Sequence, residues 1–219
     1  MPDLSTPLHL DMWREHRHKN TISSRARRAI RRLLSQNLYG LEWGDPEVVE
    51  PLRFIRDRYV LPYVRPEEVA VEIGPGGGRW TRYLLGFHTL YVVDYHPELL
   101  RELRRSFEKP NMRFIRNGGC DFPGIQEESV DFVFTFGCFV HLDVHLIGTY
   151  LENIRRILRP GGNAVVHYSD KSKIMAQLIT SFSDNTPERM RQMVSQSGFR
   201  VLEEDLTTMW HSSVIRFTR

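Results

Sequence analysis

The stretch Val69-Ala-Val-Glu-Ile-Gly-Pro-Gly-Gly-Gly-Arg-Trp-Thr81 decides the fold of this chain. Its first five residues form a short apolar run typical of a buried strand, and a helix is predicted to follow from Arg79 to Leu85. An E-x-G-x-G-x-G array lies between them. Glycines at this spacing permit a sharp strand-to-helix turn and let a ligand approach the backbone closely. Such a turn alone is also compatible with a tight turn that binds nothing.

A second predicted strand, Leu90–Asp94, ends in a carboxylate 20 residues after Gly74. A carboxylate at that point accepts two hydrogen bonds from vicinal ribose hydroxyls. Both NAD and S-adenosylmethionine carry such a ribose. Glu72 favours S-adenosylmethionine, because a carboxylate inside the turn repels a pyrophosphate but suits the ammonium of a methionine moiety. The chain also leaves no room for the separate substrate domain of an NAD-dependent oxidoreductase.

Strands and helices alternate along the rest of the chain, which predicts an α/β, doubly wound, mostly parallel seven-stranded sheet. The last two strands are joined only by Thr207–Ser212, and a parallel crossover needs a dozen residues or more, so we expect an antiparallel C-terminal hairpin. The predicted strands are Val69–Ile73, Leu90–Asp94, Met112–Arg116, Val130–Phe136, Asn163–Tyr168, Phe199–Leu206 and Ser213–Thr218. The predicted helices are Arg79–Leu85, Pro97–Phe107, Tyr150–Leu158, Lys173–Phe182 and Thr186–Ser197.

A basic N-terminal leader and helix over residues 1–44 are predicted to precede a domain of residues 45–219. Residues 1–40 hold eight basic residues against three acidic ones, a local charge of +5 that leaves −2 for the rest of a chain with net charge +3. Any nucleic-acid footprint therefore has to lie on this segment alone. Three roles are open for this segment: a lid over the cofactor, a docking arm, or a solvated surface. A helix that buries Val48 is predicted to start at Asp45-Pro46-Glu47, with Asp45 as its N-cap.

Four segments, taken in order and spacing, resemble the class I, Rossmann-like methyltransferases of the small-molecule type, which use S-adenosylmethionine. They are VEIGPGGGRWT (71–81), YVVDYHPELL (91–100), VDFVFTFGCFVHLD (130–143) and YLENIRRILRPGGNAVVHYSD (150–170), and the resemblance covers about residues 45–219. It implies S-adenosyl-L-methionine as cofactor and S-adenosyl-L-homocysteine as product. The implied cofactor contacts are Glu72, Gly74, Gly76 and Gly78 on the methionine side, Asp94 at the ribose, Tyr95 against the adenine, and the backbone of Phe136 and Gly137.

The segment after the third strand departs from the family pattern. Many relatives carry a Gly-Asp pair there, whose acid reads the adenine amino group. Here the residues are Asn117-Gly118-Gly119-Cys120-Asp121, and a glycine occupies the acidic position. Asp121 or Asn117 takes over that contact, or backbone groups alone make it. We therefore include Asn117, Cys120 and Asp121 among the candidate cofactor residues.

His141 and His167 are the candidates for a catalytic base. His141 follows the fourth strand and His167 lies near the end of the fifth, at the carboxyl edge where open α/β sheets bind ligands. Methyl transfer mainly requires alignment of donor and acceptor. An oxygen acceptor also needs a base, and a neutral imidazole serves at physiological pH. Either histidine is also compatible with a structural role, such as a helix cap.

Trp43, His145 and Tyr168 are predicted substrate-side residues. Trp43 is either a core plug or a pocket wall, and His145 lies one helical turn after His141. Because strand side chains alternate, only one of His167 and Tyr168 is expected to face the pocket. The three histidines, with Asp143 or Asp170, also suit a metal. We predict none, because Gly137-Cys138 stands where metal-dependent relatives carry an acid.

The sequence thus predicts a cytoplasmic enzyme that methylates a small molecule. An oxygen is favoured over a nitrogen as the acceptor atom. No apolar run reaches the ~18–20 residues of a bilayer span, the N-terminus lacks a secretory signal, and two cysteines favour a reducing compartment. The alternatives are an RNA or protein methyltransferase that docks through the basic segment, and a non-catalytic subunit that binds S-adenosylmethionine. No N-P-P-Y-type tetrad follows the fourth strand, where FGCF (136–139) stands, which argues against methylation of base amines. A homodimer is expected from base rates only.

Overall fold

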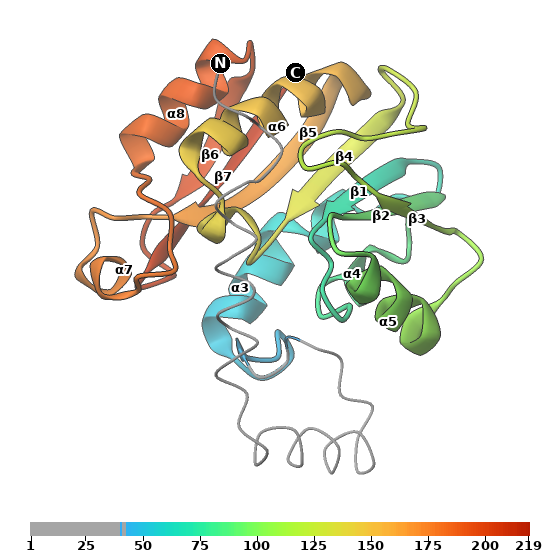
Figure 1. Cartoon of the computed structure of the whole chain (residues 1–219), viewed down its shortest axis with the longest axis horizontal. Coiled ribbons are helices and arrows are strands. Elements are labelled where there is room, and N and C mark those ends of the chain that lie inside the picture. The colour runs from blue at the N-terminus through green and yellow to red at the C-terminus, as the bar shows by residue number, and fades with distance from the viewer. Residues whose placement is uncertain (1–39, 41–42) are drawn as a thin grey trace. The chain divides into compact units, whose positions relative to one another are not determined.

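A seven-stranded sheet runs through the part of the chain that the computed structural model describes, residue 40 and residues 43–219 (Figure 1). Its strands are β1 (Val69–Ile73), β2 (Thr89–Asp94), β3 (Met112–Arg116), β4 (Val130–Thr135), β5 (Leu158–Ser169), β6 (Arg200–Asp205) and β7 (Ser212–Thr218). Their order is β3-β2-β1-β4-β5-β7-β6. Neighbours are parallel except at β7, which is antiparallel to both β5 and β6. The predicted doubly wound sheet with an antiparallel C-terminal hairpin is confirmed.

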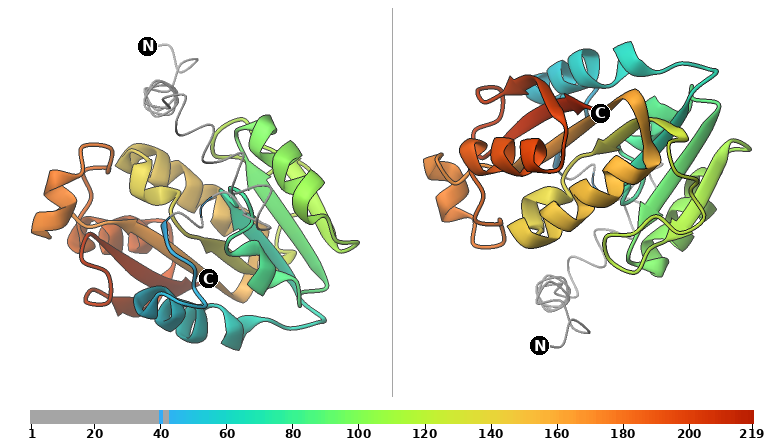
Figure 2. Two further views of the ribbon diagram at one scale, coloured as in Figure 1. Left: turned by 90° about the horizontal axis from the view of Figure 1, so that it is seen from below. Right: turned by 90° about the horizontal axis from the view of Figure 1, so that it is seen from above.

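Helices cover both faces of this sheet (Figure 2). They are α3 (Glu50–Tyr59), α4 (Thr81–Leu84), α5 (Pro97–Phe107), α6 (Val144–Ile157), α7 (Ile174–Leu178) and α8 (Pro187–Gln196), with short 3-10 turns η2 (Leu61–Tyr63) and η3 (Phe139–His141). One hydrophobic core joins α6 and α8 to Val71 of β1, and the other joins α3, α4 and α5 to its neighbour Ala70. Successive strand residues thus serve opposite faces. No helix of the described residues is long and apolar enough to cross a membrane.

The carboxyl ends of β1, β2 and β4 meet at one edge of the sheet. Ile73 of β1 is in register with Val93 of β2 and with Thr135 of β4. The chain therefore leaves all three strands side by side, and β1 and β4 mark the point where the strand order reverses. Open α/β sheets bind ligands at such a switch point. The glycine motif and the predicted acid of β2 thus lie at the edge where a cofactor is expected.

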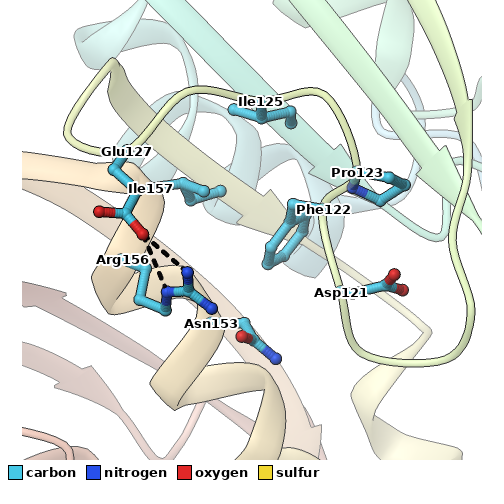
Figure 3. Close-up of a pocket in the computed structure, with 8 residues that line it drawn as sticks. All are labelled: Asp121, Phe122, Pro123, Ile125, Glu127, Asn153, Arg156 and Ile157. Carbon is cyan, nitrogen blue, oxygen red and sulfur yellow. Dashed lines mark hydrogen bonds and ion pairs between the residues drawn. The ribbon is translucent and has the colours of Figure 1, made fainter.

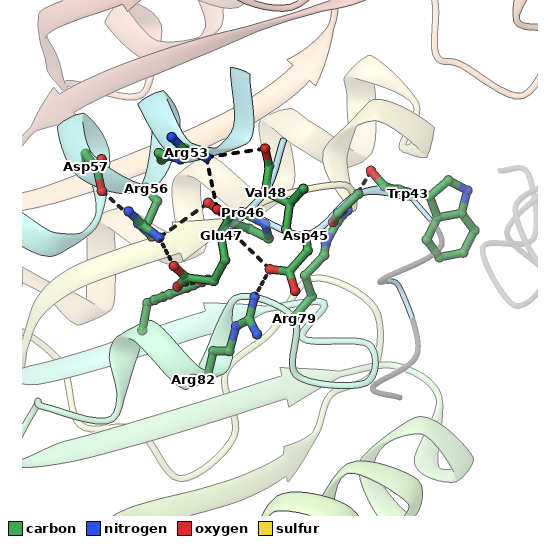
Figure 4. A network of polar contacts seen from close by, with 12 residues as sticks. Trp43, Asp45, Pro46, Glu47, Val48, Arg53, Arg56, Asp57, Arg79 and Arg82 are labelled. Carbon is green, nitrogen blue, oxygen red and sulfur yellow. Dashed lines mark hydrogen bonds and ion pairs between the residues drawn. The ribbon is translucent and has the colours of Figure 1, made fainter. Parts of the chain in front are cut away.

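The helix predicted to start at Asp45 starts later, at Glu50, and the predicted burial of Val48 is wrong. Asp45 caps a turn instead: its carboxylate accepts the amide of Glu47 at 2.9 Å, and Val48 is 73% exposed. The same carboxylate pairs with Arg82 of α4. Glu47 forms an ion pair with Arg56 (Figure 4) and accepts a hydrogen bond from the hydroxyl of Tyr83. The contacts with Arg82 and Tyr83 of α4 stabilise this turn against the helix start predicted from the sequence.

Two other predicted helices have different bounds. α6 starts at Val144 rather than at Tyr150, because Ile147 continues the buried face of the helix one turn earlier. α7 ends at Leu178 rather than at Phe182. β5 starts at Leu158 and includes Pro160-Gly161-Gly162, with a shift in its register against β4 between Val130 and Phe132. The predicted leader and helix of residues 1–44 lie outside the described residues, apart from residues 40, 43 and 44.

Candidate cofactor and acceptor site

Glycines with left-handed backbone angles build the turn after β1. The angle φ is +69° at Gly74, +56° at Gly76 and +95° at Gly78, a region that L side chains rarely adopt. The amide of Gly74 donates to the Val93 carbonyl at 2.9 Å. A Cβ on Gly74 would lie 2.7 Å from the Cβ of Cys138, in the loop after β4. Both the backbone angle and this close approach require glycine at position 74.

Glu72, on β1 just before the turn, is a buried carboxyl with 2% exposure. Its Oε2 accepts the hydroxyl of Thr81 at 2.6 Å, which links the end of β1 to the first residue of α4. Burial raises the pKa of Glu72 to about 8, the nearby Asp94 adds to this rise, and the Thr81 hydrogen bond opposes it. The carboxyl therefore changes charge near neutral pH, or when a cation approaches it.

Asp94 ends β2 beside this turn and is 8% exposed. Its Oδ1 accepts the amide of His96 at 2.8 Å, and no basic side chain of the described residues forms an ion pair with it. Burial raises the pKa of Asp94 to about 7, Glu98 adds to the rise, and backbone amides oppose it. Tyr95 follows, half-buried, with its ring edge-on to that of His96 at 5.3 Å between centroids.

The loop after β3 lies beside Asp94, because the amide of Asn117 donates to the Asp94 carbonyl at 3.2 Å. Asn117 is 2% exposed, and its Nδ2 donates to the Tyr150 hydroxyl at 2.8 Å and to the Gly119 carbonyl at 3.2 Å. Cys120 is half-buried, with Sγ 3.6 Å from the Leu146 carbonyl. Asn117 and Cys120 thus fasten this loop to α6.

Asp121 turns back on its own loop and lines a separate shallow pocket. Its Oδ1 accepts the Gly118 amide at 2.5 Å. The pocket, of about 180 Å³, lies between this loop and α6, where Arg156 binds Glu127 at 2.7 Å (Figure 3). Its lining residues are Asp121, Phe122, Pro123, Ile125, Glu127, Asn153, Arg156 and Ile157. Asp121 alone among them belongs to the predicted site.

Phe136 and Gly137, directly after β4, are packed from two sides. The Phe136 ring stacks on His167 with centroids 3.9 Å apart and 10° between planes. The guanidinium carbon of Arg79 lies 5.7 Å from the Phe136 centroid, and a Cβ on Gly137 would lie 3.6 Å from Arg79 Nη2. Arg79 is 8% exposed. Sequence reasoning missed Arg79 because it reads there as an ordinary first residue of a helix.

His167 is 3% exposed, and both of its ring nitrogens have partners. Nδ1 accepts the Gly137 amide at 3.0 Å, and Nε2 lies 2.6 Å from the Ser212 hydroxyl. Burial lowers the pKa of His167 well below its ordinary value, and His211 and Arg79 add to the decrease. The ring is therefore neutral, and neither nitrogen is left to take a substrate proton. These contacts favour a structural role over that of a base.

His141 lies in η3 and is half-buried. Its Nδ1 is 2.8 Å from the Ser181 carbonyl. A carbonyl oxygen only accepts hydrogen bonds, so Nδ1 carries a proton and Nε2 is the basic nitrogen of the neutral ring. The ring is edge-on to Phe182 at 5.4 Å, and Phe182 is edge-on to His211 at 5.3 Å. Three rings thus lie in a row beyond the ends of β4 and β5.

His211 and Phe182 were missed by sequence reasoning. His211 precedes β7 in the segment read only as a short connection, and Phe182 was placed at the end of a helix. His211 is half-buried, and burial, together with Lys173, lowers its pKa. Neither residue carries a local sequence signal, because each meets the other and His141 only through the packing of distant segments.

The three predicted substrate-side residues do not come together. Trp43 is 57% exposed, its carbonyl accepts Arg79 Nη1 at 3.2 Å, and its ring points away from the polar network (Figure 4). His145 is exposed on the first turn of α6. Tyr168 is fully buried in the core that contains α6 and α8, which gives it a core position rather than a pocket wall. Among the described residues, no cluster of three acidic, histidine or cysteine side chains suits a metal ion.

Comparisons with known proteins agree with this geometry. Residues 70–162 match the model of a methyltransferase domain family. No curated protein matches the chain. Among solved structures, an S-adenosylmethionine-dependent methyltransferase from Mesorhizobium loti is 13% identical, with a TM-score of 0.65 over 80% of this chain and 100% of that one.

Two further structures extend the comparison. A chain of the complex between the Haloferax volcanii Trm112 methyltransferase activator and a methyltransferase is 18% identical, with a TM-score of 0.62 over 84% of this chain and 99% of that one. Human N-acetylserotonin methyltransferase in complex with SAM is 18% identical, with a TM-score of 0.60 over 77% of this chain and 53% of that one. At these identities the likeness shows the fold.

Proposed function

We propose that this chain is a class I, Rossmann-like methyltransferase that uses S-adenosylmethionine and methylates a hydroxyl group of a small acceptor, with His141 as general base. The match of residues 70–162 to a methyltransferase domain family supports the reaction class. The observation that carries this proposal is the hydrogen bond from His141 Nδ1 to the Ser181 carbonyl at 2.8 Å. With Nδ1 protonated, Nε2 is the basic nitrogen of the neutral ring. The ring lies next to the carboxyl edge of the sheet. An amine that binds uncharged has no need of a base before transfer.

The residues at this edge fit S-adenosylmethionine. Asp94 is a buried carboxyl that forms no ion pair with a described residue, and vicinal ribose hydroxyls supply the donors that it lacks. Glu72 is also buried, and the ammonium of the methionine moiety supplies a cation for its carboxylate. We assign Glu72, Gly74, Gly76, Gly78, Phe136 and Gly137 to the methionine end, Asp94 to the ribose, and Tyr95, Asn117 and Cys120 to the adenine end. Asp121 is left out of this assignment, because its carboxylate binds the Gly118 amide and lines a separate pocket.

The bound cofactor supplies an electrophilic methyl group on a sulfonium, whose leaving group is a neutral thioether. The protein holds the acceptor hydroxyl in line and removes its proton. His141 Nε2 accepts that proton as the acceptor oxygen bonds to the methyl carbon, and the Ser181 carbonyl stabilises the resulting imidazolium through Nδ1–H. The edge-on rings of Phe182 and His211 favour an acceptor with a flat, apolar frame.

His141→Asn tests the base. The asparagine amide retains a donor for the Ser181 carbonyl but has no basic nitrogen. We expect kcat on hydroxyl acceptors to fall by about 10²–10⁴, with unchanged affinity for S-adenosylhomocysteine. In the wild type, kcat should fall as pH drops through the imidazole range. His88→Asn, at an exposed histidine just before β2, is the matched control. Wild-type activity in His141→Asn, or a profile flat from about pH 5 to 9, would exclude His141 as base.

Calorimetric titration with S-adenosylhomocysteine, with NAD as negative control, tests the cofactor assignment. Asp94→Ala removes two charge-assisted hydrogen bonds, each contributing about 1.5–3 kcal/mol, so the Kd should rise by at least about a hundredfold. Asp184→Ala, whose side chain is 85% exposed, should bind normally. Equal affinity in the wild type and Asp94→Ala would contradict the ribose assignment.

A further inference from the structure

His167 is a buried titratable residue that the proposed mechanism does not use. It lies on β5, opposite Val214 of β7, with 3% exposure. One face of its ring stacks on Phe136. A histidine is costly to bury unless both ring nitrogens find partners, and here both do. The ring lies between the turn after β4 and the start of β7, and it contacts Gly137 in the first and Ser212 in the second.

The hydrogen bonds define which nitrogen of His167 carries the proton. The Gly137 amide is 3.0 Å from Nδ1, and an amide only donates, so Nδ1 is unprotonated. Nε2 is therefore protonated and donates to the Ser212 hydroxyl at 2.6 Å. The Gly137 amide thus selects this tautomer, and the Ser212 hydroxyl accepts the Nε2 proton that the tautomer carries. Gly137 itself has a left-handed backbone, with φ of +78°.

A lysine fastens the other end of this chain of contacts. Lys173 Nζ donates to the Ser212 carbonyl at 2.6 Å, to the Met209 carbonyl at 2.9 Å and to the Ser213 hydroxyl at 3.0 Å. Asp170 Oδ2 accepts the Ser213 hydroxyl at 2.6 Å and lies 3.4 Å from Lys173 Nζ. Lys173 directly precedes α7, so the segment before α7 and the β6–β7 loop are joined to the residue that His167 contacts.

We propose that His167 is a positioning residue: through its fixed tautomer it orients the Gly137 amide and the turn after β4, and Ser212 and Lys173 couple that turn to α7 and the β6–β7 loop. Because Gly137 belongs to the assigned methionine end, this inference rests on the proposed function. It replaces the prediction of His167 as base with a different task. The turn after β4, which contains Gly137, is thus positioned by residues before α7 and in the β6–β7 loop.

Two variants separate positioning from simple core packing. His167→Phe keeps a ring of similar size but removes both hydrogen bonds. His167→Asn places a carbonyl oxygen where Nδ1 was, so it restores an acceptor for Gly137, while it loses the Ser212 contact and the ring that stacks on Phe136. We expect the Kd for S-adenosylhomocysteine to rise on the order of tenfold in His167→Phe, and to return close to the wild-type value in His167→Asn. His88→Asn, at an exposed histidine just before β2, is the control.

Both variants are measured for thermal unfolding as well as for binding. A purely structural role predicts that affinity follows stability, so His167→Asn and His167→Phe of equal stability would bind alike. That result, or wild-type affinity in His167→Phe, overturns the proposal. If His167→Phe does not fold, Ser212→Ala takes its place: weaker binding together with a changed Gly137 amide resonance supports positioning, and no change in either overturns it.

A measurement without ligand keeps this proposal distinct from the proposed function. In ¹⁵N spectra of the protein, His167 should show an unprotonated Nδ1 and a protonated Nε2, with no titration between about pH 5 and 8. A protonated Nδ1 overturns the proposal. The wild type could show the expected tautomer and still fail to bind S-adenosylhomocysteine. In that case the cofactor assignment is wrong, while the hydrogen bonds of His167 are as described.

Discussion

Glu72 and Asp94 are two carboxyl groups kept out of water at the same edge of the sheet. Neither forms an ion pair with a basic side chain of the described residues; their contacts are the Thr81 hydroxyl and the His96 amide. Burial therefore raises their pKa values to about 8 and about 7. Strongly shifted acids that share a cleft edge are typical of functional sites. Their cost to the fold is measurable through its dependence on pH.

Glu72→Gln is expected to change how stability depends on pH. The pKa of Glu72 rises from 4.5 in the unfolded chain to about 8 in the folded protein. The folded state therefore binds the extra proton, and this contribution is full below about pH 4.5 and lost as pH rises through about 8. Urea denaturation at pH 5 and 8 should show that the free energy of unfolding falls less between these pH values in the variant than in the wild type. Glu152→Gln, exposed on α6, controls for charge; parallel pH dependence in the wild type and Glu72→Gln would refute the prediction.

Gly74 and Gly124 allow a comparison of how much an added side chain lowers the free energy of unfolding. Both have left-handed backbone, with φ of +69° and +80°. An added Cβ meets Cys138 at 2.7 Å at Gly74 but nothing within 4 Å at Gly124. Alanine at either position should cost about 1–2 kcal/mol of backbone strain, and Gly74→Ala should lose a further ~1–3 kcal/mol from overpacking. Denaturant unfolding of both compares them, and equal losses would mean that the Cys138 loop moves aside freely.

The positions of these site residues could be predicted from the sequence because each belongs to a local strand pattern. Glu72 lies in β1, the glycines follow it, and Asp94 is the last residue of β2. The contacts that decide chemistry were not readable. His141 meets Ser181 40 residues away, and His167 meets Ser212 45 residues away. Such pairs depend on tertiary packing, so the sequence left His141 and His167 equivalent, and only the structure separates their surroundings.

At the scale of elements, the start of α8 is predicted by a local sequence signal, a threonine N-cap followed by a proline. The side chain of Thr186 accepts the Arg189 amide at 3.3 Å, and Pro187 occupies the first turn. Thr186→Ala should lower the free energy of unfolding by about 0.5–2 kcal/mol, and binding of S-adenosylhomocysteine should be unaffected. Thr180→Ala, at an exposed threonine outside the helices, is the control. A loss as large in the control would show that the hydroxyl of Thr186 does not act as a cap.

Other elements show where local reading fails. β1, β3 and α5 have the predicted bounds, because apolar runs or a first-turn proline mark them. α3 does not: Asp45-Pro46-Glu47 carries every signal of a helix start, yet Arg82 and Tyr83 hold Asp45 and Glu47 in a turn (Figure 4). These partners lie more than 30 residues away in the sequence. Tertiary contacts therefore override a strong local preference, and the helix begins at Glu50 instead.

At the scale of the whole molecule, residues Tyr39–Arg219 form one compact unit. Both hydrophobic cores lie within it. A protein that lacks residues 1–38 should therefore unfold in one cooperative transition, as urea denaturation followed by circular dichroism can test. A non-cooperative transition would contradict this expectation. With the fold retained, titration with S-adenosylhomocysteine tests the basic segment: weaker binding supports a lid, and unchanged binding supports a docking arm or a solvated surface.

The place of β1 between β2 and β4 also has a consequence in time. Val71 pairs with Tyr91 in β2, but its partner on the other side, Val133, is made 62 residues later. At the roughly 5–20 residues per second of protein synthesis, one edge of β1 waits about 3–12 s for its neighbour. An apolar strand with an open edge is prone to pair with other chains. A cell that makes this protein therefore has to shield Val69–Ile73 for seconds on the ribosome, before β4 emerges and closes the centre of the sheet.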